Sequence, residues 1–255
     1  MIEEQSTGGA LHGKVVLVTG ASRGIGAAIA EASAAAGADL ALMAPQLPIA
    51  VSKRITAMGR RTVMIAGDVG SSDDANRAVG ETIRALGHID VLVNNAAVLE
   101  VGPFLDVSED SFERVMRVNV KGVFLMTQAA GRQMAQQRAG VVINIGSDLA
   151  VRGRAGYFAY AVSKGAVLQL TRAAAVELGA FGVRVVMLSP AVTNTELAAP
   201  ALADPVVRDE LISKGTLGTF NEPEDVAAAA VFLASPAART VTGCNWPIDA
   251  GVSAK

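Results

Sequence analysis

Cysteine is almost absent from this chain, since Cys244 is the only one among 255 residues. No intrachain disulfide is therefore possible, and small disulfide-rich secreted folds are excluded. Aromatic side chains are also scarce at 4%, although apolar residues reach 51%. The apolar fraction is consequently mostly Ala, Val, Leu and Ile, which suits helices packed closely on a buried sheet. We expect a cytoplasmic protein in which Cys244 is a small, buried side chain.

An excess of charge and long apolar runs are missing as well. The formal net charge is −2, and Lys and Arg form no run or stripe, so neither nucleic acid nor an anionic membrane is an expected partner. The longest apolar run, Val226–Ala234, has nine residues, whereas a helix needs about 20 to span a bilayer. Met1–Gly9 is acidic and polar and lacks the apolar core of a signal peptide. We expect residues 1–10 to form a flexible tail.

Segments typical of strands and of helices alternate along the rest of the chain. Nearly continuous apolar strands that alternate with helices indicate parallel strands buried on both faces. No linker or repeat divides them, so we predict a single α/β domain over residues 11–255, with a doubly wound parallel sheet flanked by helices. The predicted strands are Lys14–Thr19, Leu40–Met43, Thr62–Ala66, Ile89–Val93, Val141–Ile145, Val183–Leu188 and a part of Val241–Ile248. The predicted helices are Gly26–Ala36, Ile49–Met58, Asp73–Leu86, Ser111–Met134, Tyr157–Gly179 and Pro223–Ala234.

A glycine-rich turn joins the first predicted strand to the first helix. Gly20, Gly24 and Gly26 let a dinucleotide pyrophosphate approach the backbone at a helix N-terminus, where β-carbons would obstruct it. The spacing differs from the common G-x-G-x-x-G. A tight turn that serves only helix–strand packing is therefore the competing interpretation.

Polar residues follow two further strands. Asp68 comes after the third strand and can accept a hydrogen bond from an adenine amino group, because Ser71 and Ser72 are available to cap the next helix. Asn94 and Asn95 end the fourth strand, where their side chains can bridge loops and hold the rim of a cofactor site. A simple turn is the alternative for this Asn pair.

Tyr160 and Lys164 are four residues apart and share one face of a predicted helix. A phenol has a pKa near 10, so a tyrosine that exchanges protons at neutral pH needs a nearby cation. We expect the Lys164 ammonium, together with any positive nicotinamide ring, to favour the phenolate and lower the pKa of Tyr160. Ser147 can hold a substrate oxygen against Tyr160, and Asn119 can bind a water that links Lys164 to solvent. Taken singly, the Tyr-Lys pair also fits a half-exposed helix face, and Ser147 fits a strand-end cap.

In this order and spacing, the motifs resemble the short-chain dehydrogenase/reductase family, of the type with about 250 residues and TGxxxGxG and YxxxK motifs. The resemblance runs from Gly13 to Gly251. It implies a Rossmann fold, NAD(P) binding, a homotetramer or homodimer, and a catalytic tetrad of Asn119, Ser147, Tyr160 and Lys164. The cofactor contacts that we predict are Gly20, Ser22, Arg23, Gly24, Ile25, Gly26, Asp68, Val69, Asn95, Ala96, Lys164, Pro190, Val192 and Thr195.

Some positions depart from the family pattern. Ala250 replaces the first of two late glycines, for which we expect only a modest local adjustment. Ala44 stands where members that use NAD often have Asp, and Pro45 lies where members that use NADP often have Arg. Arg23 in the glycine loop can bind a 2′-phosphate, and no acid at position 44 would repel one, so we favour NADP over NAD.

The function that we predict is an NAD(P)-dependent oxidoreductase that interconverts a secondary alcohol and a ketone by hydride transfer, with Tyr160 as the acid/base and no metal. The competing hypothesis is a catalytically silent nucleotide-binding or scaffold protein on the same fold, which would bind cofactor without turnover. The segment Glu196–Gly215 is predicted to be a mobile lid over a small hydroxyl or carbonyl substrate. Asp148, directly after Ser147, can hydrogen-bond a polyol or face solvent.

Overall fold

A computed structural model describes residues 9–254 and shows one sheet of seven strands in the order β3-β2-β1-β4-β5-β6-β7. All six neighbouring pairs are parallel. This arrangement confirms the predicted fold class. The strands are β1 Val15–Thr19, β2 Asp39–Ala44, β3 Thr62–Ala66, β4 Val91–Asn94, β5 Gly140–Ile145, β6 Val183–Pro190 and β7 Asn245–Ile248.

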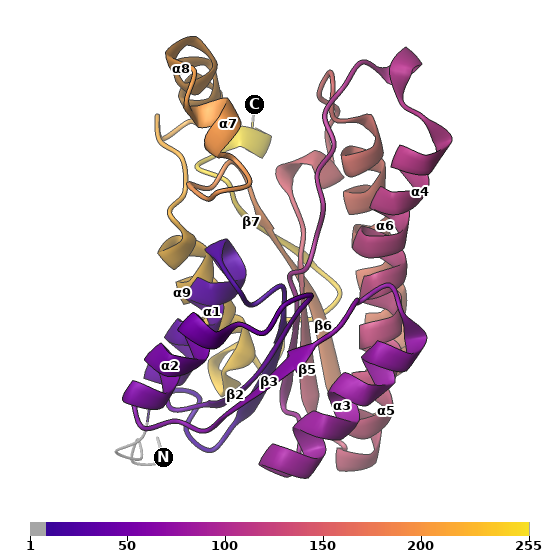
Figure 1. The fold of residues 1–255 in the computed structure, drawn as a ribbon, viewed down its shortest axis with the longest axis vertical. Helices are drawn as coiled ribbons and strands as arrows, with labels where there is room; N and C mark the ends of the chain where they lie inside the picture. Colours follow the sequence, from indigo (N-terminus) through magenta and orange to yellow (C-terminus); the bar gives the residue numbers. More distant parts are fainter. Residues whose placement is uncertain (1–8, 255) are drawn as a thin grey trace.

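Helices cover both faces of this sheet (Figure 1). One layer contains α1 Gly24–Ala35, α2 Ile49–Ala57 and α9 Pro223–Ala234. The other contains α3 Ser72–Leu86, α4 Glu109–Met116, α5 Gly122–Gln137 and α6 Phe158–Gly179. Short 3-10 turns lie at Phe104–Asp106 (η1), Asp148–Ala150 (η3), Pro236–Ala238 (η4) and Val252–Ala254 (η5).

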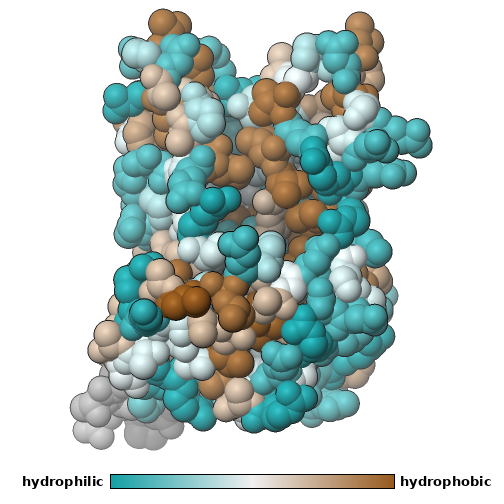
Figure 2. Space-filling model, viewed as in Figure 1, coloured by the Kyte–Doolittle hydropathy of each residue, from teal (hydrophilic) through white to brown (hydrophobic). Residues whose placement is uncertain are grey.

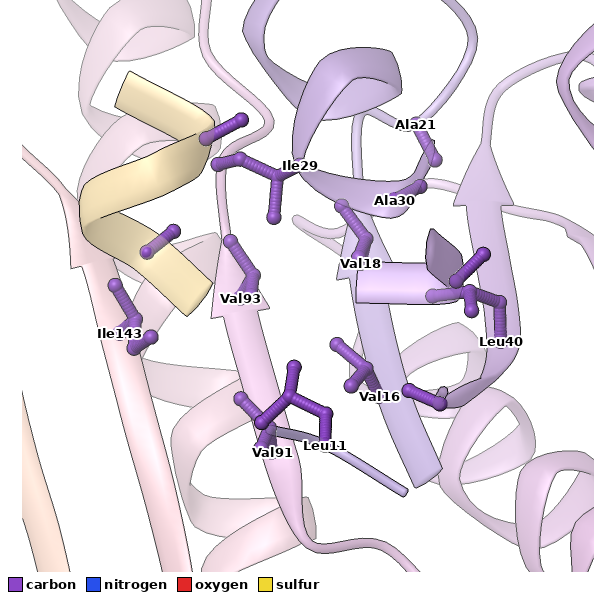
Figure 3. Packing of buried hydrophobic residues seen from close by; sticks show 14 of the residues in the cluster. Leu11, Val16, Val18, Ala21, Ile29, Ala30, Leu40, Val91, Val93 and Ile143 are labelled. Carbon is purple, nitrogen blue, oxygen red and sulfur yellow. The ribbon is translucent and has the colours of Figure 1, made fainter. Parts of the chain in front are cut away.

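Alternation along β1 explains why its sequence is apolar throughout. Val16 and Val18 pack into the cluster that includes Ile29 of α1, and Figure 3 shows these side chains together. Val15 and Leu17 belong to the cluster on the opposite face of the sheet. Because successive side chains of a strand point to opposite faces, a strand covered on both sides must be apolar at every position.

The predicted helix Ser111–Met134 is helical without a break, but it is not α-helical throughout. Helix α4 ends at Met116, a π-helical segment (η2) occupies Arg117–Lys121, and α5 begins at Gly122. The start is also earlier than predicted, because Ser108 caps α4 by accepting a hydrogen bond from the amide of Ser111. A π-turn is rare, and Arg117–Lys121 contains no Gly or Pro to mark it, so the sequence does not reveal it.

The segment predicted to be a lid contains two helices that the sequence interpretation missed. They are α7 Ala199–Leu202 and α8 Pro205–Lys214. Asp204 caps α8 by accepting hydrogen bonds from the amides of Val206 and Val207. The Asp-Pro pair was an available signal, since Pro is favoured in the first helical turn directly after such a cap.

The expected tail lies mostly outside the described residues, which begin at Gly9. Gly9 accepts a hydrogen bond from the amide of His12, and Leu11 donates its amide to Ala36 at the end of α1. Among residues 9–254, no helix has the length and apolar character that crossing a membrane requires.

Candidate active site

The predicted site residues gather at the carboxyl ends of the strands, around the point between β1 and β4 where the chain direction across the sheet reverses. Ligands of open α/β sheets bind at such a switch point. A cavity of about 1050 Å³ lies there, and Figure 2 shows this face hollowed between the projection carrying α7 and α8 and the segment before α4. Ten predicted cofactor contacts line this cavity: Gly20, Ser22, Arg23, Gly24, Ile25, Asp68, Val69, Asn95, Ala96 and Thr195.

The glycine loop forms an anion cradle at the start of α1. Gly20 and Gly24 have φ angles of 65° and 56°, which L side chains rarely adopt. No side chain caps α1, and its first turn carries no acidic residue. The free amides and the helix dipole are therefore directed at the cavity and favour a phosphate group. The donors and the glycine geometry fit the pyrophosphate of NAD(P).

Gly26 has a structural task within the same loop. A β-carbon there would stand 2.3 Å from the carbonyl oxygen of Gly20 and 2.4 Å from Nδ2 of Asn95. The Asn95 amide donates to the carbonyls of Thr19 and Gly20, so it bridges β4 to the glycine loop. Gly26 itself does not line the cavity, and its role is to let this bridge form.

Asp68 is already engaged by the protein. Its Oδ1 accepts from the amide of Gly70 at 2.9 Å, and its Oδ2 pairs with Arg117 of the π-helical segment. Burial alone would raise the pKa of Asp68, but the hydrogen bonds from Arg117 and Gly70 outweigh it and lower the pKa below its ordinary value. An adenine amino group would have to share these oxygens with Arg117.

Arg23 bridges the glycine loop to the segment before α7. Its Nη1 lies 2.7 Å from Oε2 of Glu196, and the two side chains are 71% and 69% exposed. Ala44 and Pro45 line the cavity nearby without a charge. Arg23 thus reaches the cavity mouth, but it is paired with a carboxylate that a 2′-phosphate would have to displace.

A second cavity of about 170 Å³ adjoins the first and shares Ile25, Asn95 and Thr195 with it. It brings together five further predicted residues: Ser147, Tyr160, Lys164, Pro190 and Val192. The two cavities therefore place the predicted hydride-transfer groups next to the predicted cofactor contacts.

Burial governs the titration of the Tyr160–Lys164 pair. Lys164 is 4% exposed, its Nζ donates to the carbonyl of Ile145 at 2.8 Å, and burial lowers its pKa to about 8. Burial raises the pKa of Tyr160 and the charge of Asp148 raises it further, while a hydrogen bond with Ser147 opposes them.

Lys164 alone therefore does not lower the pKa of Tyr160, and lowering by Lys164 together with a positive nicotinamide ring stays a prediction. Nζ of Lys164 is 5.4 Å from the centroid of the Tyr160 ring, and its ammonium is itself disfavoured by burial. Desolvation of the phenolate outweighs the attraction of this neighbour.

Asn119 lines neither cavity. Its Oδ1 accepts from the amide of Val98 at 2.8 Å, and its Nδ2 donates to the carbonyl of Val98 and to Ser163. The side chain therefore braces the segment after β4 against α6. The relay water next to Lys164 stays a prediction.

Comparisons with known proteins agree with this geometry. A family model described as "Enoyl-(Acyl carrier protein) reductase" matches residues 20–253. The chain belongs to the short-chain dehydrogenase/reductase family. It is 36% identical to L-rhamnose 1-dehydrogenase (NAD(P)(+)) of Sphingomonas sp. (strain SKA58), over 95% of this chain and 97% of that protein. D-threitol dehydrogenase of Mycolicibacterium smegmatis is 37% identical, with coverage of 96% and 95%.

A solved relative shows the same fold. The chain matches a short-chain type dehydrogenase/reductase from Mycobacterium marinum with a TM-score of 0.91 and 35% identity, over 96% of this chain and 97% of that one. As a short-chain dehydrogenase/reductase, the protein is an NAD(P)-dependent oxidoreductase acting on CH–OH groups, which confirms the predicted activity. The silent-scaffold alternative gains no support from these relatives.

Sequence reasoning missed one partner in this dehydrogenase site. It noted Asp148 but did not pair it with Arg152, whereas Arg152 donates to Asp148 at 2.8 Å through Nε. The spacing of four residues was a possible signal, but it precedes α6 and lies in a turn where helical spacing is no guide. The two side chains were therefore left unpaired in the sequence interpretation.

Proposed function

We propose that one catalytic domain over residues 11–255 interconverts a small secondary alcohol and a ketone, with Tyr160 as the acid/base. The juxtaposition of Ser147, Tyr160 and Lys164 in one cavity, beside the glycine cradle, is the observation that carries this assignment. A bound NAD(P) would supply the hydride acceptor or donor. Pro190, Val192 and Thr195 line the wall between cradle and phenol and would orient that ring.

Each polar group has a separate task in this proposal. Tyr160 takes the hydroxyl proton of an alcohol or returns it to a carbonyl oxygen. Ser147 fixes that oxygen against the phenol, and Lys164, anchored on Ile145, supplies positive charge and a ribose contact. Asn119 acts without lining either cavity. Its hydrogen bonds to Val98 and Ser163 hold in place the helix that carries Tyr160 and Lys164.

We propose a small sugar or polyol as the substrate. The cavity volume of about 170 Å³ suits a small molecule, and its lining combines Asp148, Arg154 and Tyr157 with apolar side chains such as Leu149 and Leu211. Relatives of this chain are named for L-rhamnose and D-threitol. Arg154 lies over the Tyr157 ring at 4.5 Å, so both can offer donors along one side of a polyhydroxylated chain.

Our proposal for the cofactor is a preference for NADP over NAD. Ala44 and Pro45 offer no carboxylate to hold a ribose diol, and the exposed guanidinium of Arg23 lies on the same cavity. Fluorescence titration with NADH and NADPH separately measures the preference directly. Tighter binding of NADH would contradict it.

We also propose that the protein is cytoplasmic and forms a homo-oligomer. The single cysteine favours a cytoplasmic protein. Exposed apolar side chains on α5 and α6, including Phe124 at 47% and Val176 at 79%, favour a homodimer or homotetramer formed through these helices. Light scattering at several protein concentrations would distinguish a monomer from either assembly.

The activity itself is tested by a substrate screen. The protein is incubated with NAD⁺ or NADP⁺ and a panel of sugars and polyols that includes L-rhamnose and D-threitol, and reduced cofactor is followed by absorbance. We expect turnover of at least one polyhydroxylated alcohol. Oxidation of apolar alcohols alone would contradict the proposed substrate class.

A further inference from the structure

The carboxylate of Asp148 lies directly beside the hydroxyl of Ser147 in the smaller cavity. Ser147 Oγ donates to Asp148 Oδ1 at 2.9 Å and accepts a hydrogen bond from the amide of Leu149 at 3.2 Å. The side chain of Asp148 is only 9% exposed. This carboxylate is therefore built into the site and does not simply face solvent.

Arg152 holds the other oxygen of the same carboxylate. Its Nε donates to Oδ2 of Asp148 at 2.8 Å, and its Nη2 donates to the same atom. Charge-assisted hydrogen bonds of this kind are stronger than neutral ones and fix geometry. With Oδ2 on Arg152 and Oδ1 on Ser147, the carboxylate is held at both ends.

The number of protons available decides what Ser147 can do. A serine hydroxyl has one proton and two acceptor lone pairs, and an ionised carboxylate only accepts. The Ser147 proton therefore lies on the side of Asp148. Ser147 and Tyr160 line the same cavity, so a phenolate at Tyr160 and a substrate oxygen would both have to compete with Asp148 for this proton.

We infer that Asp148, clamped by Arg152, is a positioning residue that withholds the Ser147 proton from Tyr160 and so favours the neutral phenol. The inference rests on the proposed role of Tyr160 as the acid/base. A phenolate would be stabilised by a donor from Ser147, and Asp148 competes for that donor. The neutral phenol is the form that protonates a carbonyl oxygen during reduction, whereas alcohol oxidation needs the phenolate.

Asp148 and Arg152 affect the ionisation of Tyr160 in opposite directions. The titratable and charged side chains that line this cavity are Asp148, Arg154, Tyr157, Tyr160 and Lys164. The negative charge of Asp148 disfavours the Tyr160 phenolate, whereas Arg152 partly neutralises Asp148. Removing the acid should therefore ease ionisation of Tyr160, and removing the arginine should hinder it.

The first test uses the pH dependence of kcat/KM for alcohol oxidation, with L-rhamnose or D-threitol as the probe and whichever cofactor is turned over. Asp148→Asn should move the acid limb to lower pH by about one unit. Arg152→Gln should move it to higher pH. Arg54→Gln is the matched control. Arg54 on α2 makes a similar two-donor contact with Glu31 on α1, and both residues lie outside the two cavities. The pH profile of this variant should coincide with that of the wild type. Profiles that fall in height without moving, or that move in the same direction for both variants, would overturn the inference.

A second test needs no substrate, so it separates this inference from the proposed function. The chain has only two tyrosines, and Tyr157→Phe leaves Tyr160 as the single phenol. Its ionisation is followed by ultraviolet difference absorbance up to the pH at which circular dichroism shows unfolding. Asp148→Asn in this background should ionise at lower pH than the background alone, and Arg152→Gln should not. Superimposed titration curves for the Asp148→Asn variant and its background would refute the inference whether or not a substrate is known.

Discussion

Replacing Lys164 with Met should raise the free energy of unfolding near pH 7 while it removes activity. Burial lowers the pKa of Lys164 from 10.5 to about 8, a difference of roughly 2.5 units, and one unit corresponds to about 1.36 kcal/mol. The buried ammonium therefore costs the folded state about 3 kcal/mol at neutral pH. Met fills a similar volume, but it leaves the carbonyl of Ile145 without its donor, which costs about 1 kcal/mol. The expected net gain is about 2 kcal/mol.

The pH dependence of this gain identifies its cause. A lysine whose folded pKa is below its unfolded value destabilises the protein fully below about pH 8, and the cost disappears as pH rises towards 10.5. The advantage of Lys164→Met over the wild type should therefore shrink steadily between these values. Ionisation of Tyr160 adds its own pH dependence at the upper end, but it occurs in both proteins and largely cancels in the difference.

Urea unfolding measures this difference at fixed protein concentration and at several pH values. Lys53→Met serves as the control, since Lys53 is exposed on α2 and its replacement relieves no burial. A Lys164→Met variant that is less stable than the wild type near pH 7, or whose stability difference does not change with pH, would refute the reasoning about a costly buried ammonium.

The remaining predictions concern the glycine loop, the late turn and the cavity mouth. Gly26→Ala should abolish nucleotide binding in a fluorescence titration, because its β-carbon would collide with Gly20 and Asn95. Gly80→Ala on α3 is the control, because nothing lies within 4 Å of the added β-carbon. This variant should keep nucleotide binding and raise the free energy of unfolding by up to about 1 kcal/mol. Ala250 has a φ of 50°, so Ala250→Gly should raise the urea midpoint by an amount equivalent to about 0.5–1 kcal/mol, and a lower midpoint would argue against strain there. Glu196→Gln should change the free energy of unfolding by less than about 1 kcal/mol, since its ion pair with Arg23 is exposed. It should tighten NADPH binding relative to NADH binding, because it frees Arg23. An unchanged ratio of the two dissociation constants would show that Arg23 does not recognise the 2′-phosphate.

Local patterns predicted the fold because each strand is covered by helices on both faces. Continuous apolar runs such as that of β1 are visible in the sequence, and so are the glycines of the first βα turn. The π-helical segment at Arg117–Lys121 was invisible, since it contains no Gly or Pro that would mark it. Ala250 was expected to cause a modest adjustment, and its positive φ shows that the glycine conformation is kept at the cost of strain.

The residue types of the site were also predictable, but their energetics were not. Tyr160 and Lys164 share a helix face because of their spacing. The direction of the Tyr160 pKa depends on burial and on Asp148, which only the packed structure supplies. The hydrogen bonds of Asn119 to Val98 and Ser163 likewise join segments far apart in the sequence, so spacing alone could not predict this brace.

Turnover and cofactor binding by Tyr160→Phe test the central assignment most directly. With a substrate found in the sugar and polyol screen, kcat/KM should fall by at least about a hundredfold. The dissociation constant of the cofactor should stay within about twofold of the wild type, because Tyr160 does not line the cavity around the glycine cradle. Tyr157→Phe, on the same cavity but without a lysine four residues later, should lose much less turnover. If Tyr160→Phe instead keeps wild-type turnover, Tyr160 is not the acid/base of this enzyme.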